Sequence, residues 1–182
     1  MIPDRAGNVE SWPIETLVTI LLRQFKRLLS PVELTDAEMQ ALGQQVAARD
    51  LTDSRLPALR TVLAERVAES EAVLAQWGLN FSQALATTMA DIAGWETTAD
   101  FLTIANEKIN AEIRISAGAA LLVALGEPRF APYLIQAIEH DLAAEGQLDV
   151  DATIAKRALL FAAQIDPNAA DWLAQARAWA QL

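Results

Sequence analysis

The sequence contains no cysteine among its 182 residues. This absence excludes disulfides, thiolate metal sites and thiol nucleophiles, so packing alone must hold the fold. Glycine and proline, which interrupt helices, occur seven times each, and aromatic side chains account for 6% of the chain. Alanine, the strongest helix former, makes up about one residue in five. The composition therefore predicts an all-α protein whose helices approach one another closely.

Basic side chains are also scarce, because 14 lysines and arginines stand against 24 acids and give a net charge of −10. This charge repels phosphate backbones, so nucleic acid is not expected as a partner. No apolar run approaches the roughly 18 uncharged residues of a membrane-spanning helix. The N-terminal residues, which include Asp4, Arg5 and Glu10, lack the pattern of a secretory signal. We therefore expect a soluble cytoplasmic protein.

The first 78 residues show the pattern of three helices. Apolar residues recur there at helical spacing over three segments, residues 11–30, 35–49 and 52–77. Ser11 is a candidate cap of the first helix, Thr35 with Glu38 forms the pattern of a capping box, and Gly78 suits the end of the third helix. The broad apolar stripe of the first helix predicts core packing in preference to binding at a membrane surface.

The remaining residues show helix patterns that come in pairs. The three predicted pairs are 80–94 with 97–108, 110–125 with 128–144, and 151–165 with 167–182. Together with the first three helices, they give about nine helices. We expect a three-helix N-terminal segment, residues 1–78, packed on an array of helix pairs, residues 79–182, within one continuous domain.

The middle pair carries the most specific pattern in the chain. Small residues at 117–120 let its two helices come close, and Gly126 followed by Pro128 suits the tight turn between them. With its Leu and Ile positions, this segment resembles a HEAT-like repeat of the short type first described in phycobilisome lyases. The outline recurs weakly on both sides at offsets of roughly 30 to 40 residues, the period of stacked helix pairs.

The resemblance implies a right-handed α-α superhelix over residues 79–182. It also implies that Arg114, as the repeat arginine, pairs with an acid or a carbonyl of a neighbouring repeat. HEAT-like arrays act mostly as protein-binding scaffolds, so the implied function is non-catalytic protein binding through an acidic concave face. Two alternatives stay open: a chromophore-handling protein of the phycobilisome lyase type, and a helical domain that binds a small molecule. The HEAT-like DNA glycosylases need a basic groove, which the acidic composition disfavours.

The second helices of stacked pairs line the concave surface of such an array. Their polar positions, together with a tryptophan near the end of the chain, are the candidate partner-binding residues: Asp100, Thr103, Glu107, Arg129, Tyr133, Gln136, His140 and Trp179. The partner implied is another protein, and a basic surface would suit the acidic members of this set. Self-association is compatible with the same residues. No cofactor is implied, and a membrane is not expected as a partner.

An acidic stretch surrounds the only histidine, His140. It holds five acids and no base: Glu139, Asp141, Glu145, Asp149 and Asp151. Oxygen ligands at this density suit a hard cation, but their spacing matches no EF-hand, and Asp149 and Asp151 are natural caps of the next helix. As a general base, His140 has no serine, cysteine or tyrosine partner at a recognisable spacing. We therefore expect neither a metal site nor a catalytic residue.

Overall fold

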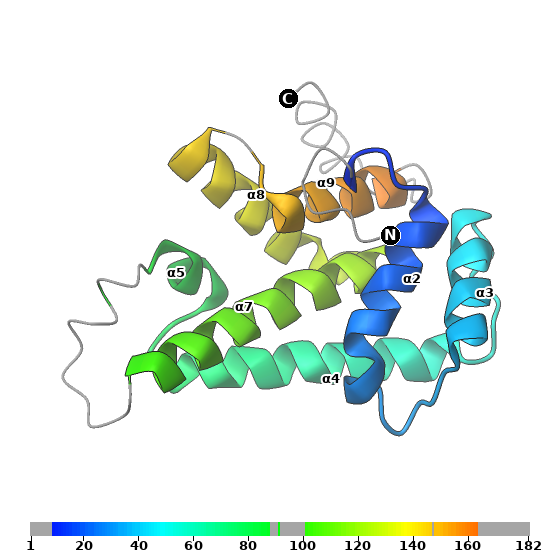
Figure 1. Ribbon diagram of the computed structural model, residues 1–182, viewed down its shortest axis with the longest axis horizontal. Coiled ribbons are helices and arrows are strands. Elements are labelled where there is room, and N and C mark those ends of the chain that lie inside the picture. The colour runs from blue at the N-terminus through cyan, green and yellow to red at the C-terminus, as the bar shows by residue number, and fades with distance from the viewer. Residues whose placement is uncertain (1–8, 88–90, 92–100, 147, 164–182) are drawn as a thin grey trace.

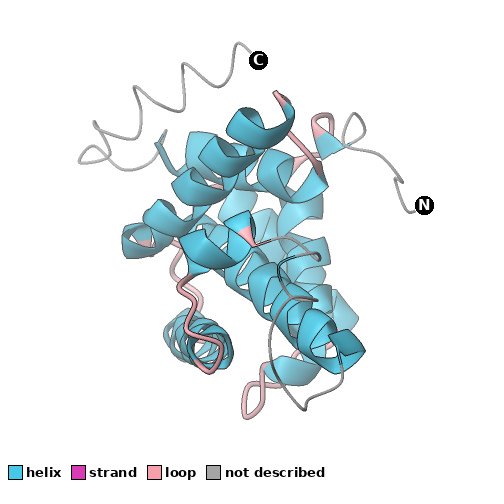
Figure 2. Cartoon of the chain, turned by 90° about the vertical axis from the view of Figure 1, so that its left-hand side faces the viewer, coloured by secondary structure: helices cyan, strands magenta, loops and turns pink. Residues whose placement is uncertain are grey.

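The computed structural model describes residues 9–87, 91, 101–146 and 148–163. All regular structure in this part of the chain is helical, without any strand (Figures 1 and 2), and the all-α prediction is confirmed. The elements are α2 (Ile14–Phe25), the 3-10 helix η1 (Lys26–Leu28), α3 (Asp36–Ala47), α4 (Leu56–Ala75), α5 (Phe81–Ala86), α7 (Phe101–Ala124), the 3-10 helix η2 (Pro128–Phe130), α8 (Ala131–Glu145) and α9 (Val150–Ala163).

Seven α-helices lie in the described residues, against about nine expected for the whole chain. The prediction of separate helices at 97–108 and 110–125 is wrong, because α7 is one continuous helix of 24 residues. The expected junction contains no glycine or proline, and an ion pair of 3.0 Å from Lys108 Nζ to Glu112 Oε1 spans it. The expected helix at 167–182 lies outside the described residues, as does most of the last part, 88–94, of the helix expected at 80–94.

Several helix ends follow the cap signals in the sequence. The Thr35 hydroxyl accepts a hydrogen bond from the Glu38 backbone N–H (3.1 Å), and Asn80 begins α5 with a complete capping box, as predicted. The prediction that Ser11 caps the first helix is wrong. Pro13 occupies the N-cap position, since its extended backbone and fixed φ place the first helical residue after it.

The helix α7 lies at the centre of the molecule and contacts α2, α4, α5, α8 and α9 (Figure 1). It runs antiparallel to α4, because Arg60 Nε near the start of α4 donates to the Leu125 carbonyl at the end of α7 (2.8 Å). After a turn at Gly126 (φ +95°), α8 runs back along α7, and after a turn at Gly146 (φ +68°) α9 reverses again. The last three helices that the structure describes thus form two successive antiparallel hairpins.

One hydrophobic core contains residues of every described α-helix. In α2, Leu17, Leu22 and Phe25 are buried in it, so the apolar stripe of this helix packs in the core, as predicted. Among the described helices, none combines the length and the apolarity that a membrane span requires.

The residues just before α2 are fastened to α9 by polar contacts. Arg157 Nη1 donates to the Val9 carbonyl (2.9 Å) and also to the Trp12 carbonyl. The ammonium group of Lys156 forms an ion pair with Glu10. Lys156 is only 5% exposed, and Val9 is fully buried. We call this set of contacts the N-terminal clamp; it joins residues that lie 145 to 148 positions apart in the chain.

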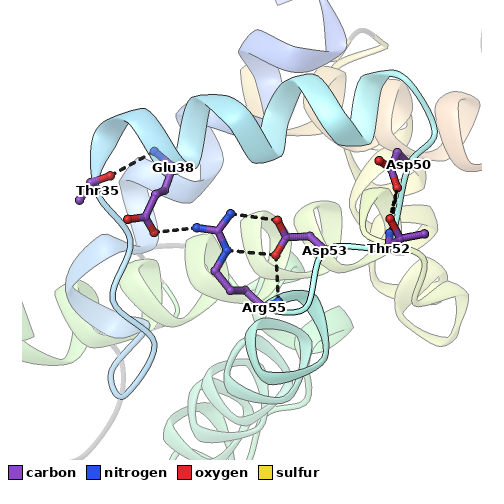
Figure 3. A network of polar contacts seen from close by, with 6 residues as sticks. All are labelled: Thr35, Glu38, Asp50, Thr52, Asp53 and Arg55. Atoms are coloured by element: carbon purple, nitrogen blue, oxygen red, sulfur yellow. Dashed lines mark hydrogen bonds and ion pairs between the residues drawn. The ribbon is translucent and has the colours of Figure 1, made fainter.

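A charged network fixes the connection between α3 and α4 (Figure 3). The Arg55 guanidinium contacts both carboxylate oxygens of Asp53 (3.0 and 2.9 Å), and its Nη1 donates to Glu38 Oε2 (2.7 Å). The hydrogen bonds from Arg55 lower the pKa of Asp53 from 3.8 to about 2. Because the folded value is the lower one, the network stabilises the fold above pH 3.8, and this contribution is lost as the pH falls to about 2.

Candidate functional site

A pocket of about 340 Å³ opens between α7, α8 and the start of α9. We call it the acidic pocket. Its polar lining consists of Lys108, Glu112, Ser116, His140, Asp141, Asp149 and Asp151. Its apolar lining consists of Leu85, Ile109, Ile113, Ala137 and Ala152. The volume lies at the lower end of the range found for ligand pockets.

Helix geometry brings the α7 members of the pocket together. Lys108, Glu112 and Ser116 follow one another at four-residue spacing, which places them along one face. The side chain of Lys108 is 7% exposed and that of Glu112 is 15% exposed. Their ion pair of 3.0 Å therefore lies in a largely water-free part of the wall. Glu112 balances the only ammonium group among the pocket residues that the structure describes.

The turn between α8 and α9 brings the three aspartates of the pocket together. Asp141 Oδ2 accepts a hydrogen bond from the Asp149 backbone N–H (3.0 Å). Asp149 Oδ1 accepts one from the Ala152 N–H (2.8 Å), so Asp149 caps α9, as predicted. Asp151 lies in the first turn of α9 and accepts no hydrogen bond from any described residue. The side chains of Asp141 and Asp149 also lie within hydrogen-bonding reach of each other.

The environment of the pocket disfavours the ionised form of three of its carboxyl groups. Burial raises the pKa of Asp141 and of Asp151, and the charge of the neighbouring Asp149 adds to the increase at both residues. Burial also raises the pKa of Glu112, although its hydrogen bond with Lys108 acts in the opposite direction. Acidic groups with raised pKa values cluster at functional sites, where a bound cation can compensate their charge.

Asp141→Asn is expected to stabilise the protein at neutral pH by about 0.5 kcal/mol. The pKa of Asp141 is raised in the folded state, so the ionised carboxylate destabilises the fold above that pKa. Asparagine keeps an oxygen that can accept the hydrogen bond from Asp149. The gain should shrink as the pH falls toward the unfolded value of 3.8, because the folded protein then protonates Asp141.

Urea unfolding at neutral and acidic pH measures this effect. Glu139→Gln is the matched control. Glu139 also lies near the C-terminal end of α8, where a negative charge is unfavourable, but unlike Asp141 its side chain is exposed. Equal gains in the two variants would contradict a contribution from burial of Asp141.

Two large apolar side chains border the pocket and remain exposed to water. Ile109 is 41% exposed and Ile113 is 44% exposed, and both also contribute to the pocket lining. They lie four residues apart and therefore on the same face of α7. Exposed apolar surface beside polar groups is typical of interaction sites.

A groove runs along the opposite side of Ile113. It consists of two adjoining pockets, of about 350 and 310 Å³, which share Leu28, Asn110 and Arg114. Arg114 is exposed and forms no hydrogen bond or ion pair with any residue that the structure describes. The pairing that the sequence resemblance implies for Arg114 is therefore not found in this part of the chain.

The predicted partner-binding residues do not gather in one place. His140 lines the acidic pocket, whereas Glu107 lines the part of the groove on the α4 side, which shares no residue with the acidic pocket. Thr103 is exposed near the start of α7, and Gln136 is half-buried on α8. Asp100 and Trp179 lie outside the described residues.

Tyr133 and Arg129 belong to an aromatic cluster at the start of α8. The Tyr133 ring packs against Phe81 (centroids 5.7 Å apart) and Phe130 (6.2 Å). Its hydroxyl donates a hydrogen bond to Glu71, and burial together with this carboxylate raises the pKa of Tyr133 to about 12. Arg129 lies over the Phe130 ring, 4.7 Å from its centroid. These contacts tie α8 to α4 and α5.

Sequence reasoning identified the acids of the α8–α9 turn and His140 but missed Lys108, Glu112 and Ser116. Their four-residue spacing was a usable signal, but the helix break expected after Lys108 concealed it. Ser116 lines the same pocket as His140, yet no hydrogen bond joins the two side chains. Among the described residues, no group of three or more histidine, aspartate or glutamate side chains is placed to hold a metal ion.

No protein-family model matches the sequence, and no curated protein or solved structure is significantly similar to it. The HEAT-like resemblance therefore remains a prediction from the residues of the middle helix pair.

Proposed function

We propose that this protein is a non-catalytic helical scaffold that binds another protein, with residues 79–182 arranged as a HEAT-like right-handed α-α superhelix. The successive hairpins α7–α8 and α8–α9 support this arrangement, because stacked repeats are built from such hairpins. The continuous α7 modifies it, since the first predicted pair does not form a separate hairpin there.

The observation that carries the proposal is the surface of α7 beside the acidic pocket. Ile109 and Ile113 offer apolar contact area, and the adjoining carboxylates offer charge complementarity to a basic group. Protein interfaces combine apolar contacts with complementary charges, the former for affinity and the latter for specificity and association rate. The expected partner therefore presents an apolar segment that carries lysine or arginine.

Ile113→Asp is expected to reduce capture of the partner at least about tenfold, because it places a charge at the centre of the apolar contact. The tagged protein is used as bait in an extract of the native cell at low salt. The amount of captured protein is then measured relative to the amount of bait. Ala68→Asp is the matched control, since Ala68 is exposed on α4 and lines neither the acidic pocket nor the groove.

The wild type and Ala68→Asp should retain a stoichiometric partner, and higher salt should weaken its binding. Repeated failure of the wild type to retain a partner, or equal capture by all three proteins, would contradict the proposal.

Binding of a small molecule is the second candidate function. The acidic pocket has a suitable volume and several polar groups that converge on it. Its size favours a short ligand over the extended tetrapyrrole that a chromophore-handling protein would hold.

A further inference from the structure

The large apolar side chains that remain exposed in the described part of the chain gather at one place. They are Ile109 (41% exposed), Ile113 (44%) and Val150 (37%). Ile109 and Ile113 line the acidic pocket, and Val150 stands in the sequence between Asp149 and Asp151, which line it too. Single exposed apolar residues are normal on a protein surface, but a group of them at one place is typical of an interface.

The two sides of this apolar face belong to different cavities. Ile109 and Ile113 lie between two rows of α7 side chains, because each residue turns the helix by about 100°. One row lines the acidic pocket, and the other lines the groove: Lys108, Glu112 and Ser116 on the first side, and Asn110, Arg114 and Ala117 on the second. Ile113 itself lines a cavity on each side, so it marks the border between them.

The cavity on the groove side is basic. It has a volume of about 310 Å³ and holds Arg27 of η1 and Arg114 of α7, without an acid among its described lining residues. We call it the arginine cavity. Neither arginine forms an ion pair with any residue that the structure describes, and both are exposed. Their guanidinium groups can therefore accept a carboxylate from another molecule.

The acidic pocket has the opposite balance. Its described lining holds four carboxylates against one ammonium group, and that group, on Lys108, is already paired with Glu112. The surface around Ile113 is thus negative on one side, apolar in the middle and positive on the other side. Such a surface is complementary to a second copy of itself, because a twofold rotation exchanges its two sides.

We propose that the chain forms a symmetric dimer through this surface. A twofold axis parallel to α7 brings the Ile109 and Ile113 side chains of the two copies together. The same rotation places the acidic pocket of each copy opposite the arginine cavity of the other, so every charge contact occurs twice. The inference deepens the proposed function, on which it rests for the role of this surface in protein binding. A second copy offers apolar contact area together with arginine, which is the partner chemistry that this surface suits.

Sedimentation velocity of the purified full chain tests the dimer. Between about 1 and 300 µM at low salt, we expect a reversible equilibrium of monomer and dimer, with a Kd of about 1 to 100 µM for an interface of small area. Higher salt should weaken the dimer, because its charge contacts lie near the protein surface. A chain that stays monomeric throughout this range would overturn the proposal.

Ile113→Asp tests the apolar centre of the interface. It places two like charges beside the twofold axis and should weaken dimerisation at least about tenfold. Ala68→Asp adds the same charge at an exposed position of α4 that lines none of the three cavities, and it should leave the Kd unchanged. Equal effects of the two substitutions would overturn the proposal.

An exchange of charges tests how the two copies face each other. Arg114→Glu and Asp151→Lys each place like charges opposite one another and should weaken dimerisation at least about threefold. The double variant exchanges the two charges, so its Kd should return to within about twofold of the wild-type value. Circular dichroism verifies that each variant is folded. Two weakened single variants without recovery in the double variant would overturn the symmetric arrangement.

Capture from the native extract separates the dimer from the proposed function. If the purified chain is monomeric but captures a different protein that Ile113→Asp does not retain, the dimer is refuted and the proposed function stands. If the chain dimerises as expected but no different protein is captured, the dimer stands and the binding of another protein is refuted.

Discussion

Gly43→Ala is expected to lower the free energy of unfolding by about 2 to 3 kcal/mol. Gly43 lies where α3 crosses α2, and a Cβ at this position would lie 2.5 Å from Thr19 Oγ1 and 2.6 Å from the Glu15 carbonyl oxygen. The carbonyl belongs to the backbone of α2, so no side-chain rotation can remove the contact. The two helices would have to separate, and this cost outweighs the gain of about 1 kcal/mol in helix propensity.

Gly118→Ala is the matched comparison for this prediction. A Cβ at Gly118 would lie 2.9 Å from Val67 Cγ2 and 3.4 Å from Phe25 Cζ, which are side-chain atoms. These side chains can move slightly, and the free-energy cost of this movement offsets much of the gain in helix propensity. The free energy of unfolding should therefore change by no more than about 1 kcal/mol.

Thermal and urea unfolding measure both variants. For a chain of this length, we expect Gly43→Ala to lower Tm by about 4 to 10 °C. If Gly43→Ala is as stable as the wild type, the close approach of α2 and α3 is contradicted.

Glu10→Ala is expected to destabilise the protein by about 2 to 3 kcal/mol. The change removes the acid that pairs with Lys156, which is 5% exposed and would be left as a buried charge without its ion-pair partner. The side chain of Glu10 is 47% exposed, so the loss should lie below that of a fully buried pair. Glu65→Ala, which removes an exposed acid of α4, should change stability by no more than about 0.5 kcal/mol.

A second substitution separates the ion pair from other roles of Glu10. Lys156→Met removes the buried charge and keeps a side chain of similar length, so the double variant should recover most of the stability lost in Glu10→Ala. The free energies from urea unfolding of the four proteins form a double-mutant cycle. A cycle without coupling between the two positions would show that the ion pair does not hold the N-terminal clamp together.

The sequence predicts the features of this fold that depend on neighbouring residues. The cap at Thr35, the capping box at Asn80 and the turn at Gly126 require only a few consecutive residues, and each is found. The predicted box at Thr35 is only half formed, because the Glu38 carboxylate bonds to Arg55 instead. The predicted break near Lys108 follows from applying the paired-helix pattern of residues 110–144 to the residues before it, where the pattern is weak. The ion pair with Glu112 and the absence of glycine or proline keep that helix intact.

The candidate site depends on contacts that local patterns do not reveal. The acids around His140 can be identified in the sequence, but their proximity to Ser116 arises from the packing of α8 and α9 on α7. A helix break after Lys108 would make residues 97–108 the second helix of a pair, and Glu107 would then lie on the same concave face as His140. In the continuous helix, these two residues line separate cavities.

The N-terminal clamp has a consequence for synthesis on the ribosome. The residues that Val9 and Glu10 contact, Arg157 and Lys156, are added about 145 residues after them. At about 5 to 20 residues per second, this delay is on the order of ten seconds. A nascent chain that has emerged only through α8 therefore leaves the Val9 carbonyl and the Glu10 carboxylate without these partners, so the N-terminal clamp closes only after α9 has been made.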